Sequence, residues 1–284
     1  MPLVRRNLAR AAAVAAIAAA GVPAAARAQT AGAPAEVVVI GTVHSPTPAY
    51  SGDSLLAILE RLRPVVILVE LDSTFFDDSS RLRPEFRAIS MENAAASRYA
   101  ERTGTPLWPY DVAGRNQEYE RHDYFNRQRQ MSQAIGRLDG QHGLGPEAQG
   151  LLRELDEVSA LRDAIGADRP RVINSAAADS TIRLKQRYGY EGLARVIALT
   201  PALAEFTDFW GWAAAFWDRR NQAMRANIVR AAGRYPGRRI VVICGYEHRY
   251  YLRTLLREDD AAGRLGLREY WEYGAGETEG TIPR

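Results

Sequence analysis

Short apolar runs rich in β-branched residues occur near both ends of the chain and constrain its fold more than any other feature. The run "EVVVIG" begins at Glu36, "VVILVEL" begins at Val65, and "RRIVVICG" ends at Gly245. Strands that are apolar on both faces usually lie parallel in a sheet that helices cover. The segment "SLLAILERL" between the first two runs has leucines at helical spacing, which predicts a strand-helix-strand (βαβ) unit.

The rest of the chain extends this pattern. A helix from about Glu92 to Arg102 leads into a third candidate strand, "TPLWPYD", which ends at Asp111. From Gln117 to about Ala232 the pattern is mostly helical. Glycine and proline predict breaks in it near positions 140–145, 169–170 and 200–201. After "RRIVVICG", the segments "RYYLRTLLRE" and "LGLREYWEY" predict a helix and a last strand.

These elements together predict an α/β (α+β) fold. We expect a mixed central sheet built from two βαβ-type units at the chain ends, with a helical insertion or cap at residues 116–203 between them.

The first 28 residues resemble a secretory signal peptide. A basic start is followed by an apolar run from Ala11 to Val22 and by the small-x-small cleavage site "ARA" at 26–28. We therefore expect one domain at 29–273, a flexible tail at 274–284, and a periplasmic or secreted location. No later run approaches the length of a membrane span, so we expect none in the mature chain.

Charge and cysteine content restrict the function. The leader carries four arginines and no acids, so the mature chain has 33 bases against 34 acids. Because nucleic-acid binders keep a basic face, we expect no nucleic-acid partner. Cys244 is the single cysteine and lies in an apolar run, which favours a buried structural thiol over a nucleophile.

Two of the four histidines occupy equivalent places. Each apolar strand at the chain ends is followed by Gly-x-x-His, which gives His44 in "VVVIGTVH" and His248 in "IVVICGYEH". In open α/β sheets ligands bind beyond the carboxyl ends of the strands. If the two units lie side by side, both imidazoles reach one crevice. His122 and His142 lie in polar or glycine-rich segments, and we assign them no role.

Two acidic residues also follow strands. Glu70 closes "VILVEL" and Asp111 closes "TPLWPYD". Each alone could cap the next helix, but an unpaired carboxylate after an apolar run is costly. Their joint placement with the two histidines predicts four metal ligands or proton carriers at one edge of the sheet.

Arg220 and Asn221 interrupt the apolar stripe of the helix expected from about Ala202 to Ala232. Polar groups on a buried face need partners. Arg220 is therefore either an oxyanion clamp or one half of a structural salt bridge to Glu70 or Asp111.

Five segments resemble, in order, the TraB/Tiki superfamily, which includes GumN-like and pheromone-shutdown proteins. They are "GTVHSP" (41–46), "RPVVILVELD" (63–72), "MENAAASRYAERTGTPLWPYD" (91–111), "RRNQAMRANI" (219–228) and "VVICGYEHRYYLRTLL" (241–256). A more distant resemblance extends to erythromycin esterases and ChaN-like proteins. In the Tiki branch, the resemblance implies a metalloprotease in which His44, His248 and Glu70 serve a divalent metal. Glu92, Asp111, Arg220 and Asn221 also match polar positions that recur in the family.

The leading hypothesis is metal-assisted hydrolysis of a small-molecule or peptide substrate. His44, Glu70 and His248 would hold zinc, manganese or cobalt. Glu92 or Asp111 would act as general base, and Arg220 with Asn221 would stabilise the oxyanion.

Three alternatives stay open. The first is a metal-free hydrolase of the erythromycin-esterase kind, in which His44 or His248 activates water beside Glu70. The second is a ChaN-like haem or iron carrier with His, Tyr246 or Tyr250 as ligand. The third is a protein that binds a partner through its aromatic helical region. The sequence specifies neither substrate nor oligomeric state.

Overall fold

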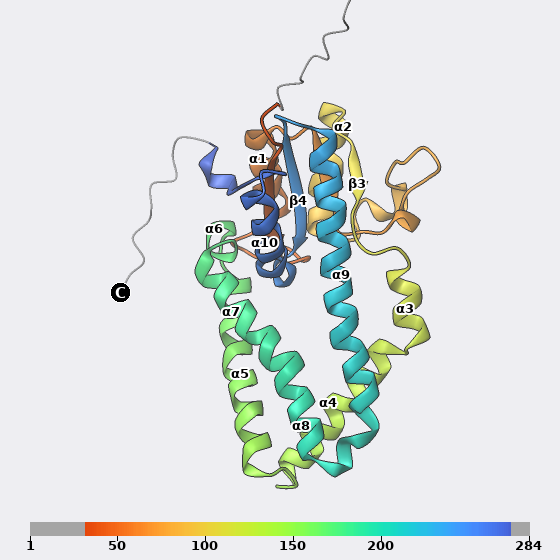
Figure 1. The fold of residues 1–284 in the computed structure, drawn as a ribbon, viewed down its shortest axis with the longest axis vertical. Helices are drawn as coiled ribbons and strands as arrows, with labels where there is room; N and C mark the ends of the chain where they lie inside the picture. The colour runs from red at the N-terminus through yellow and green to blue at the C-terminus, as the bar shows by residue number, and fades with distance from the viewer. Residues whose placement is uncertain (1–31, 274–284) are drawn as a thin grey trace, which may run out of the picture. The chain divides into compact units, whose positions relative to one another are not determined.

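The computed structural model describes residues 32–273 (Figure 1). The expected signal peptide and C-terminal tail lie outside the described residues. In chain order the elements are β1 (Glu36–Thr42), α1 (Gly52–Leu62), β2 (Val66–Val69), the 3₁₀ turns η1 (Ser73–Phe75) and η2 (Pro84–Phe86), α2 (Met91–Thr103), β3 (Leu107–Pro109), α3 (Arg115–Arg121), α4 (Tyr124–Gly140), α5 (Pro146–Gly166), α6 (Pro170–Ile173), α7 (Ala176–Arg187), the π-helical segment η3 (Tyr188–Gly192), α8 (Leu193–Leu199), the 3₁₀ segment η4 (Pro201–Phe206), α9 (Thr207–Arg234), β4 (Arg239–Gly245), α10 (Tyr246–Ala261), β5 (Gly266–Arg268) and the 3₁₀ turn η5 (Tyr270–Glu272).

The α/β class is confirmed, and the sheet differs from the expected one in two ways. Its strand order is β3-β2-β4-β1-β5, and every pairing is parallel rather than mixed. Helical crossovers between successive strands return the chain to the same edge, which gives parallel pairing. The two terminal units also interleave instead of lying side by side, because β4 inserts between β1 and β2.

Helices cover both faces of the sheet. Alternate residues of the central strands point to opposite sides, so Val38 and Ile40 pack with helices α1 and α2, whereas Val37 and Val39 pack with α9 and α10. Cys244 is buried on the α9 side, which confirms a buried thiol, and burial raises its pKa well above the usual value.

The segment expected as a helical insertion forms a bundle beyond the carboxyl edge of the sheet (Figure 1). Helices α4, α5 and α8 share an apolar core with the N-terminal half of α9. The C-terminal half of α9 packs on the sheet instead, through Met224 and Ile228. This long helix therefore connects the two cores, and Arg220 and Asn221 lie buried where it passes from one to the other.

The breaks between helices occur at the glycine and proline residues that predicted them. α4 ends at Gly140 and α5 begins with Pro146 at its first turn, and η4 begins at Pro201. Proline fits the first turn of a helix because the missing N–H has no partner there in any case. The last strand is shorter than the segment "LGLREYWEY" predicts. Only Gly266–Arg268 pairs with β1, and the chain then forms the 3₁₀ turn η5.

Candidate functional site at the carboxyl edge of the sheet

Three neighbouring strands deliver the two histidines and Glu70 to one edge. Glu70 follows β2 directly, His44 lies two residues beyond β1, and His248 lies in the first turn of α10, just after β4. Thr42 and Gly245 are partners across β1 and β4, so the two Gly-x-x-His turns leave the sheet at one level. With β4 in the centre, the three chain ends meet where open α/β sheets bind ligands.

Glu70 is the centre of this group. Its Oε1 atom lies 3.0 Å from Nη2 of Arg220 and 3.3 Å from Nε2 of His248. Its Oε2 atom accepts the Gly245 N–H at 2.7 Å. Burial raises the pKa of Glu70, but His248, Arg220 and the amide outweigh burial and lower that pKa to about 2. Glu70 is therefore a carboxylate.

Asn221 fixes the tautomer of His248. The Asn221 amide nitrogen donates to the Trp217 carbonyl at 2.8 Å, so its oxygen accepts from Nδ1 of His248 at 2.9 Å. The Trp217 ring stacks on the imidazole at a centroid distance of 4.1 Å. Burial lowers the pKa of His248 to about 4. The neutral ring thus presents the lone pair of Nε2 to Oε1 of Glu70, an oxygen that also contacts Arg220.

The first turn of α2 holds His44. Oε1 of Glu92 lies 2.5 Å from Nδ1 of His44, and the Met91 N–H donates to the His44 carbonyl at 2.9 Å. The hydrogen bond that Nδ1 of His44 donates to Glu92 is the main cause that raises the pKa of His44. The His44 side chain is 58% exposed and Glu92 only 10%, so His44 is the part of the site that solvent reaches.

Gly245 brings the His44 and Glu70 groups together. A Cβ atom at this position would lie 2.8 Å from Nε2 of His44 and 3.6 Å from Oε2 of Glu70. Nε2 of His44 and Oε2 of Glu70 therefore lie on the same side of Gly245, and Nε2 of His248 contacts Glu70 directly. Each Nδ1 is held by a separate acceptor.

Arg220 makes both of the salt bridges that the sequence left open. Its guanidinium contacts Asp111 through Nε at 3.2 Å and Nη2 at 2.8 Å, and Glu70 through Nη2. Its Nη1 donates to the Tyr119 hydroxyl at 3.1 Å. Asp111 also accepts from Arg115 at 3.0 Å and from the Val112 N–H. These carboxylates raise the pKa of Arg220 despite its burial.

The structure thus gathers all seven residues that the sequence singled out, and the contacts favour positioning roles for four of them. Glu92 orients His44 and Asn221 orients His248. Asp111 and Arg220 pair with one another. Neither the Asp111 carboxylate nor the Asn221 amide is left free to act on a substrate.

The supporting contacts of Arg115, Tyr119 and Trp217 were not predicted from the sequence. Gly245 was visible only as part of the Gly-x-x-His pattern, and its hydrogen bond to Glu70 was not expected. Only Arg115 had a local signal, because it lies four residues after Asp111. Of the proposed haem ligands, Tyr246 donates its hydroxyl to the Arg162 carbonyl at 3.2 Å, and neither Tyr246 nor Tyr250 contacts His44 or His248 through a hydrogen bond.

The side chains of His44, His248 and Glu70 are chemically suited to bind a divalent cation. Two imidazole nitrogens and a carboxylate are ordinary ligands of zinc, and the outer nitrogen of such histidines is commonly held by an acceptor, as Glu92 and Asn221 do here. Within residues 32–273, however, no three His, Cys, Asp or Glu side chains already stand as a metal-binding group, since Glu70 is engaged by Arg220 and Gly245.

Comparison of the chain with protein-family models, with curated proteins and with solved structures gives no match. The resemblance to the TraB/Tiki superfamily therefore stays a prediction from the motifs. Among residues 32–273, no helix has the length and hydropathy needed to cross a bilayer.

The pKa shifts predict that the metal-free protein loses stability in acid. His248 is protonated near pH 6.5 when unfolded but only near pH 4 when folded, so the unfolded chain binds more protons as the pH falls through this window. Glu70 acts with the same sign between about 4.5 and 2. The raised pKa of His44 acts in the opposite sense, because its contribution is full below pH 6.5 and is lost as the pH rises.

Thermal unfolding of chelator-treated protein between pH 7 and pH 4 measures the contribution of His248. The unfolding midpoint should fall with pH in the wild type and fall less steeply in His248→Gln. Equal slopes in the two proteins would show that His248 is not buried in its neutral form.

Replacement of Gly245 by alanine should displace His44 with little backbone strain. Gly245 has a φ of −54°, which alanine adopts readily, but the new Cβ would overlap Nε2 and Cε1 of His44. We expect the raised His44 pKa to return toward 6.5 as the contact with Glu92 breaks. NMR titration of the four histidines measures this, with Gly233→Ala as control because a Cβ there meets nothing within 4 Å. An unchanged His44 titration in Gly245→Ala would contradict the geometry.

Proposed function

We propose that this chain is an exported hydrolase whose reacting centre is the carboxyl edge of the sheet, where His44, His248 and Glu70 hold a divalent metal ion. One observation supports the proposal: Nε2 of His248 lies 3.3 Å from Glu70 and Nε2 of His44 lies on the same side of Gly245 as that carboxylate, while Glu92 and Asn221 hold the two Nδ1 atoms. A divalent cation would compensate the two nitrogen lone pairs beside this carboxylate, which Arg220 contacts through Oε1.

Zinc suits two imidazoles and a carboxylate best, and manganese or cobalt would also be accepted. When bound, such an ion would supply Lewis acidity, which lowers the pKa of water and polarises a carbonyl or related group.

The residues of the chain perform the remaining tasks. Glu92 holds Nδ1 of His44 and Asn221 holds Nδ1 of His248, which leaves both Nε2 atoms for a ligand. The ion pairs of Arg220 with Glu70 and Asp111 fix the orientation of the Glu70 carboxylate. Such partners of ligands typically contribute a factor of about 10 to 100 in metal affinity or activity.

A metal-free hydrolase is the second candidate, and a different observation favours it. The imidazole of His44 is exposed and paired with Glu92 at 2.5 Å, which is the arrangement of a general base oriented by a carboxylate. In that case Nε2 of His44 would take a proton from water during attack on the substrate, and Glu92 would stabilise the imidazolium.

Chelation separates the two candidates. The mature protein is assayed against chromogenic esters, amides, phosphodiesters and glycosides, before and after treatment with a chelator. The metal-dependent proposal expects activity on at least one substrate, its loss on chelation, and its return with Zn²⁺, Mn²⁺ or Co²⁺. Activity that resists chelation would favour the His44–Glu92 base, and absence of activity on every class would contradict both.

A further inference from the structure

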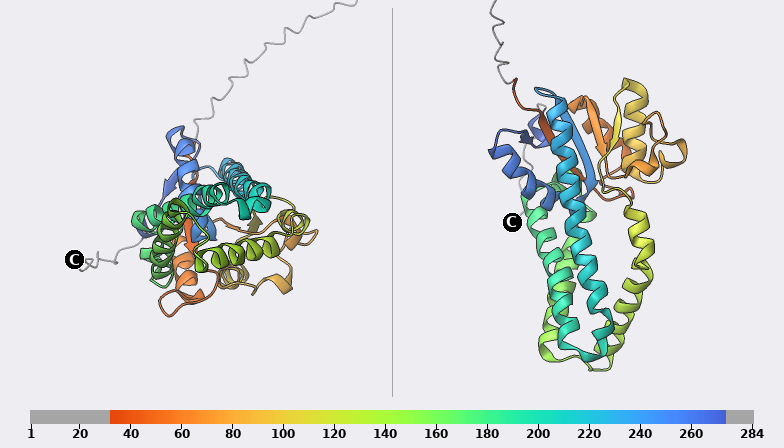
Figure 2. Two further views of the ribbon diagram at one scale, coloured as in Figure 1. Left: turned by 90° about the horizontal axis from the view of Figure 1, so that it is seen from below. Right: turned by 45° about the vertical axis from the view of Figure 1, so that its right-hand side comes forward.

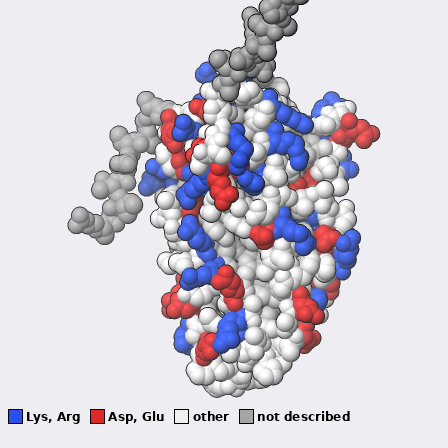
Figure 3. All heavy atoms as spheres, viewed as in Figure 1, with Lys and Arg blue, Asp and Glu red and all other residues white. Residues whose placement is uncertain are grey.

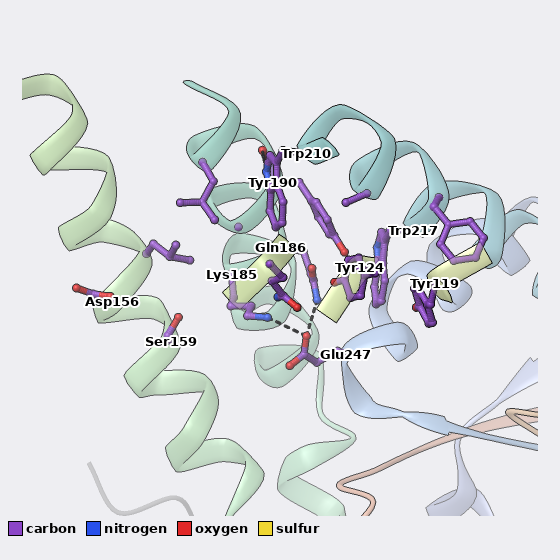
Figure 4. A pocket seen from close by; sticks show the side chains of 16 residues that line it. Tyr119, Tyr124, Asp156, Ser159, Lys185, Gln186, Tyr190, Trp210, Trp217 and Glu247 are labelled. Atoms are coloured by element: carbon purple, nitrogen blue, oxygen red, sulfur yellow. Dashed lines mark hydrogen bonds and ion pairs between the residues drawn. The ribbon is translucent and has the colours of Figure 1, made fainter. Parts of the chain in front are cut away.

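A cavity of about 400 Å³ lies among the helices of the bundle (Figure 4). Its lining comes from helices α3, α4, α5, α7, α8, α9 and α10 and from the π-helical segment η3. The volume lies within the range of about 300 to 1,000 Å³ that is usual for small-molecule sites.

One side of the cavity is aromatic. Tyr190 stacks on Trp210 at a centroid distance of 5.5 Å and lies 5.9 Å from Trp217. Tyr119 and Phe216 meet edge to face at 5.2 Å. The Trp210 ring nitrogen donates to the Tyr190 carbonyl at 3.1 Å, which holds the rings in place. The π-helical segment that carries Tyr190 is a rare element often associated with functional sites.

The other side is polar. Lys185 and Gln186 both donate to Oε2 of Glu247, at 2.9 Å and 2.6 Å (Figure 4). Glu247 also pairs with Arg162 at 2.6 Å, and Asp156 is a second carboxylate of the lining. The two cations and two carboxylates on this side balance in number, so they impose no preference for a strongly charged ligand. Ser159 and Gln128 also line the cavity. Neither side chain makes a hydrogen bond to another part of residues 32–273, so both side chains are available to a ligand.

Two residues connect the cavity with the reacting centre. Trp217 lines the cavity and stacks on His248. Tyr119 lines it and accepts from Arg220. A ligand held against these rings therefore lies beside the residues of the proposed chemistry.

We propose that this cavity binds an uncharged saccharide unit, which would be part of the substrate. A sugar ring has an apolar face of C–H groups and an edge of hydroxyl groups. This cavity has an aromatic wall on one side and, on the other, neutral hydrogen-bonding groups with charges that balance in number. The assignment as substrate rests on the proposed function, whereas the assignment as a binding site does not.

Calorimetric titration of the mature protein tests the proposal with cellotriose, maltotriose, mannotriose and chitotriose as probes. Trialanine and benzyltrimethylammonium serve as a peptide and a cationic comparison. At least one trisaccharide should bind saturably. Tyr190→Ala should weaken that binding at least about tenfold, and Tyr190→Phe, which keeps the ring, should weaken it less. Tyr188→Ala is the matched control, because Tyr188 belongs to the same π-helical segment but does not line the cavity.

The same titration in His44→Ala keeps this proposal separate from the proposed function, because the cavity does not include His44. Sugar binding that persists in His44→Ala supports the cavity even if no hydrolysis is found. The proposal is overturned if no trisaccharide binds, if Tyr190→Ala leaves binding unchanged while its circular dichroism is native, or if trialanine or benzyltrimethylammonium binds more tightly than every sugar. If Tyr190→Ala does not fold, the affinity of Tyr190→Phe and the comparison ligands test the proposal instead.

Discussion

Replacement of His44 by alanine is expected to remove hydrolytic activity while leaving the fold intact. His44 supplies either a metal ligand or the general base, and loss of a general base alone typically costs about 10² to 10⁴ in rate. The side chain is 58% exposed and contributes nothing to the apolar cores. We therefore expect at least about a 1,000-fold loss in kcat/KM, and a free energy of unfolding within about 1 kcal/mol of the wild type.

His142→Ala is a closely matched control for this experiment. His142 is also exposed and also has a left-handed backbone, with φ of 56° against 62° for His44. The backbone effect of alanine is therefore similar at the two positions, and only the chemistry of the site differs. Comparable activity in His44→Ala and His142→Ala would exclude His44 from the reaction.

Replacement of Arg220 by methionine is expected to be the most destabilising single change in the site. It leaves the buried carboxylates of Glu70 and Asp111 without their shared cation, and breaking a buried ion pair in this way costs about 3 to 5 kcal/mol. In a domain of this size, each kcal/mol lowers the unfolding midpoint by about 2 to 4 °C. Differential scanning calorimetry should therefore show a fall on the order of 10 °C.

Arg219→Met is the control for that measurement, because Arg219 is the adjacent residue of α9 and is 55% exposed. Its guanidinium makes a long ion pair of 3.9 Å with Glu118 and lies 5.2 Å from the centre of the Phe216 ring. This substitution should change the midpoint by no more than a degree or two. Adding Asp111→Asn to Arg220→Met removes one orphaned charge and should restore part of the stability. A midpoint in Arg220→Met equal to that of Arg219→Met would show that the ion pairs are not formed in solution.

The strand ends of this fold could be predicted because their signals are local. β-branched runs and the glycine turns after them are visible over a few residues, and parallel strands present their carboxyl ends at one edge. This reasoning placed His44, Glu70 and His248 together. It could not place β4 between β1 and β2, because strand order depends on pairings between distant residues, such as Glu36 with Arg239 and Val66 with Ile240.

Partners that come from distant segments were equally hidden. The burial of Arg220 followed from the apolar stripe around it, but only the folded chain shows that one guanidinium serves both Glu70 and Asp111. Likewise, Lys185 and Glu247 meet across 62 positions of sequence. Gly245 is visible in the sequence as part of the Gly-x-x-His pattern, but only the structure shows that its missing side chain makes room for the ring of His44.

The central claim is that the two Gly-x-x-His turns and Glu70 hold one metal ion. Elemental analysis of the mature protein, purified without chelators, tests it most directly when His44→Ala and His248→Ala are analysed beside the wild type. The account predicts about one divalent transition-metal ion per wild-type chain and a loss of most of it in each variant, with circular dichroism unchanged. A wild-type chain free of such metal, or the same metal content in all three proteins, would contradict it.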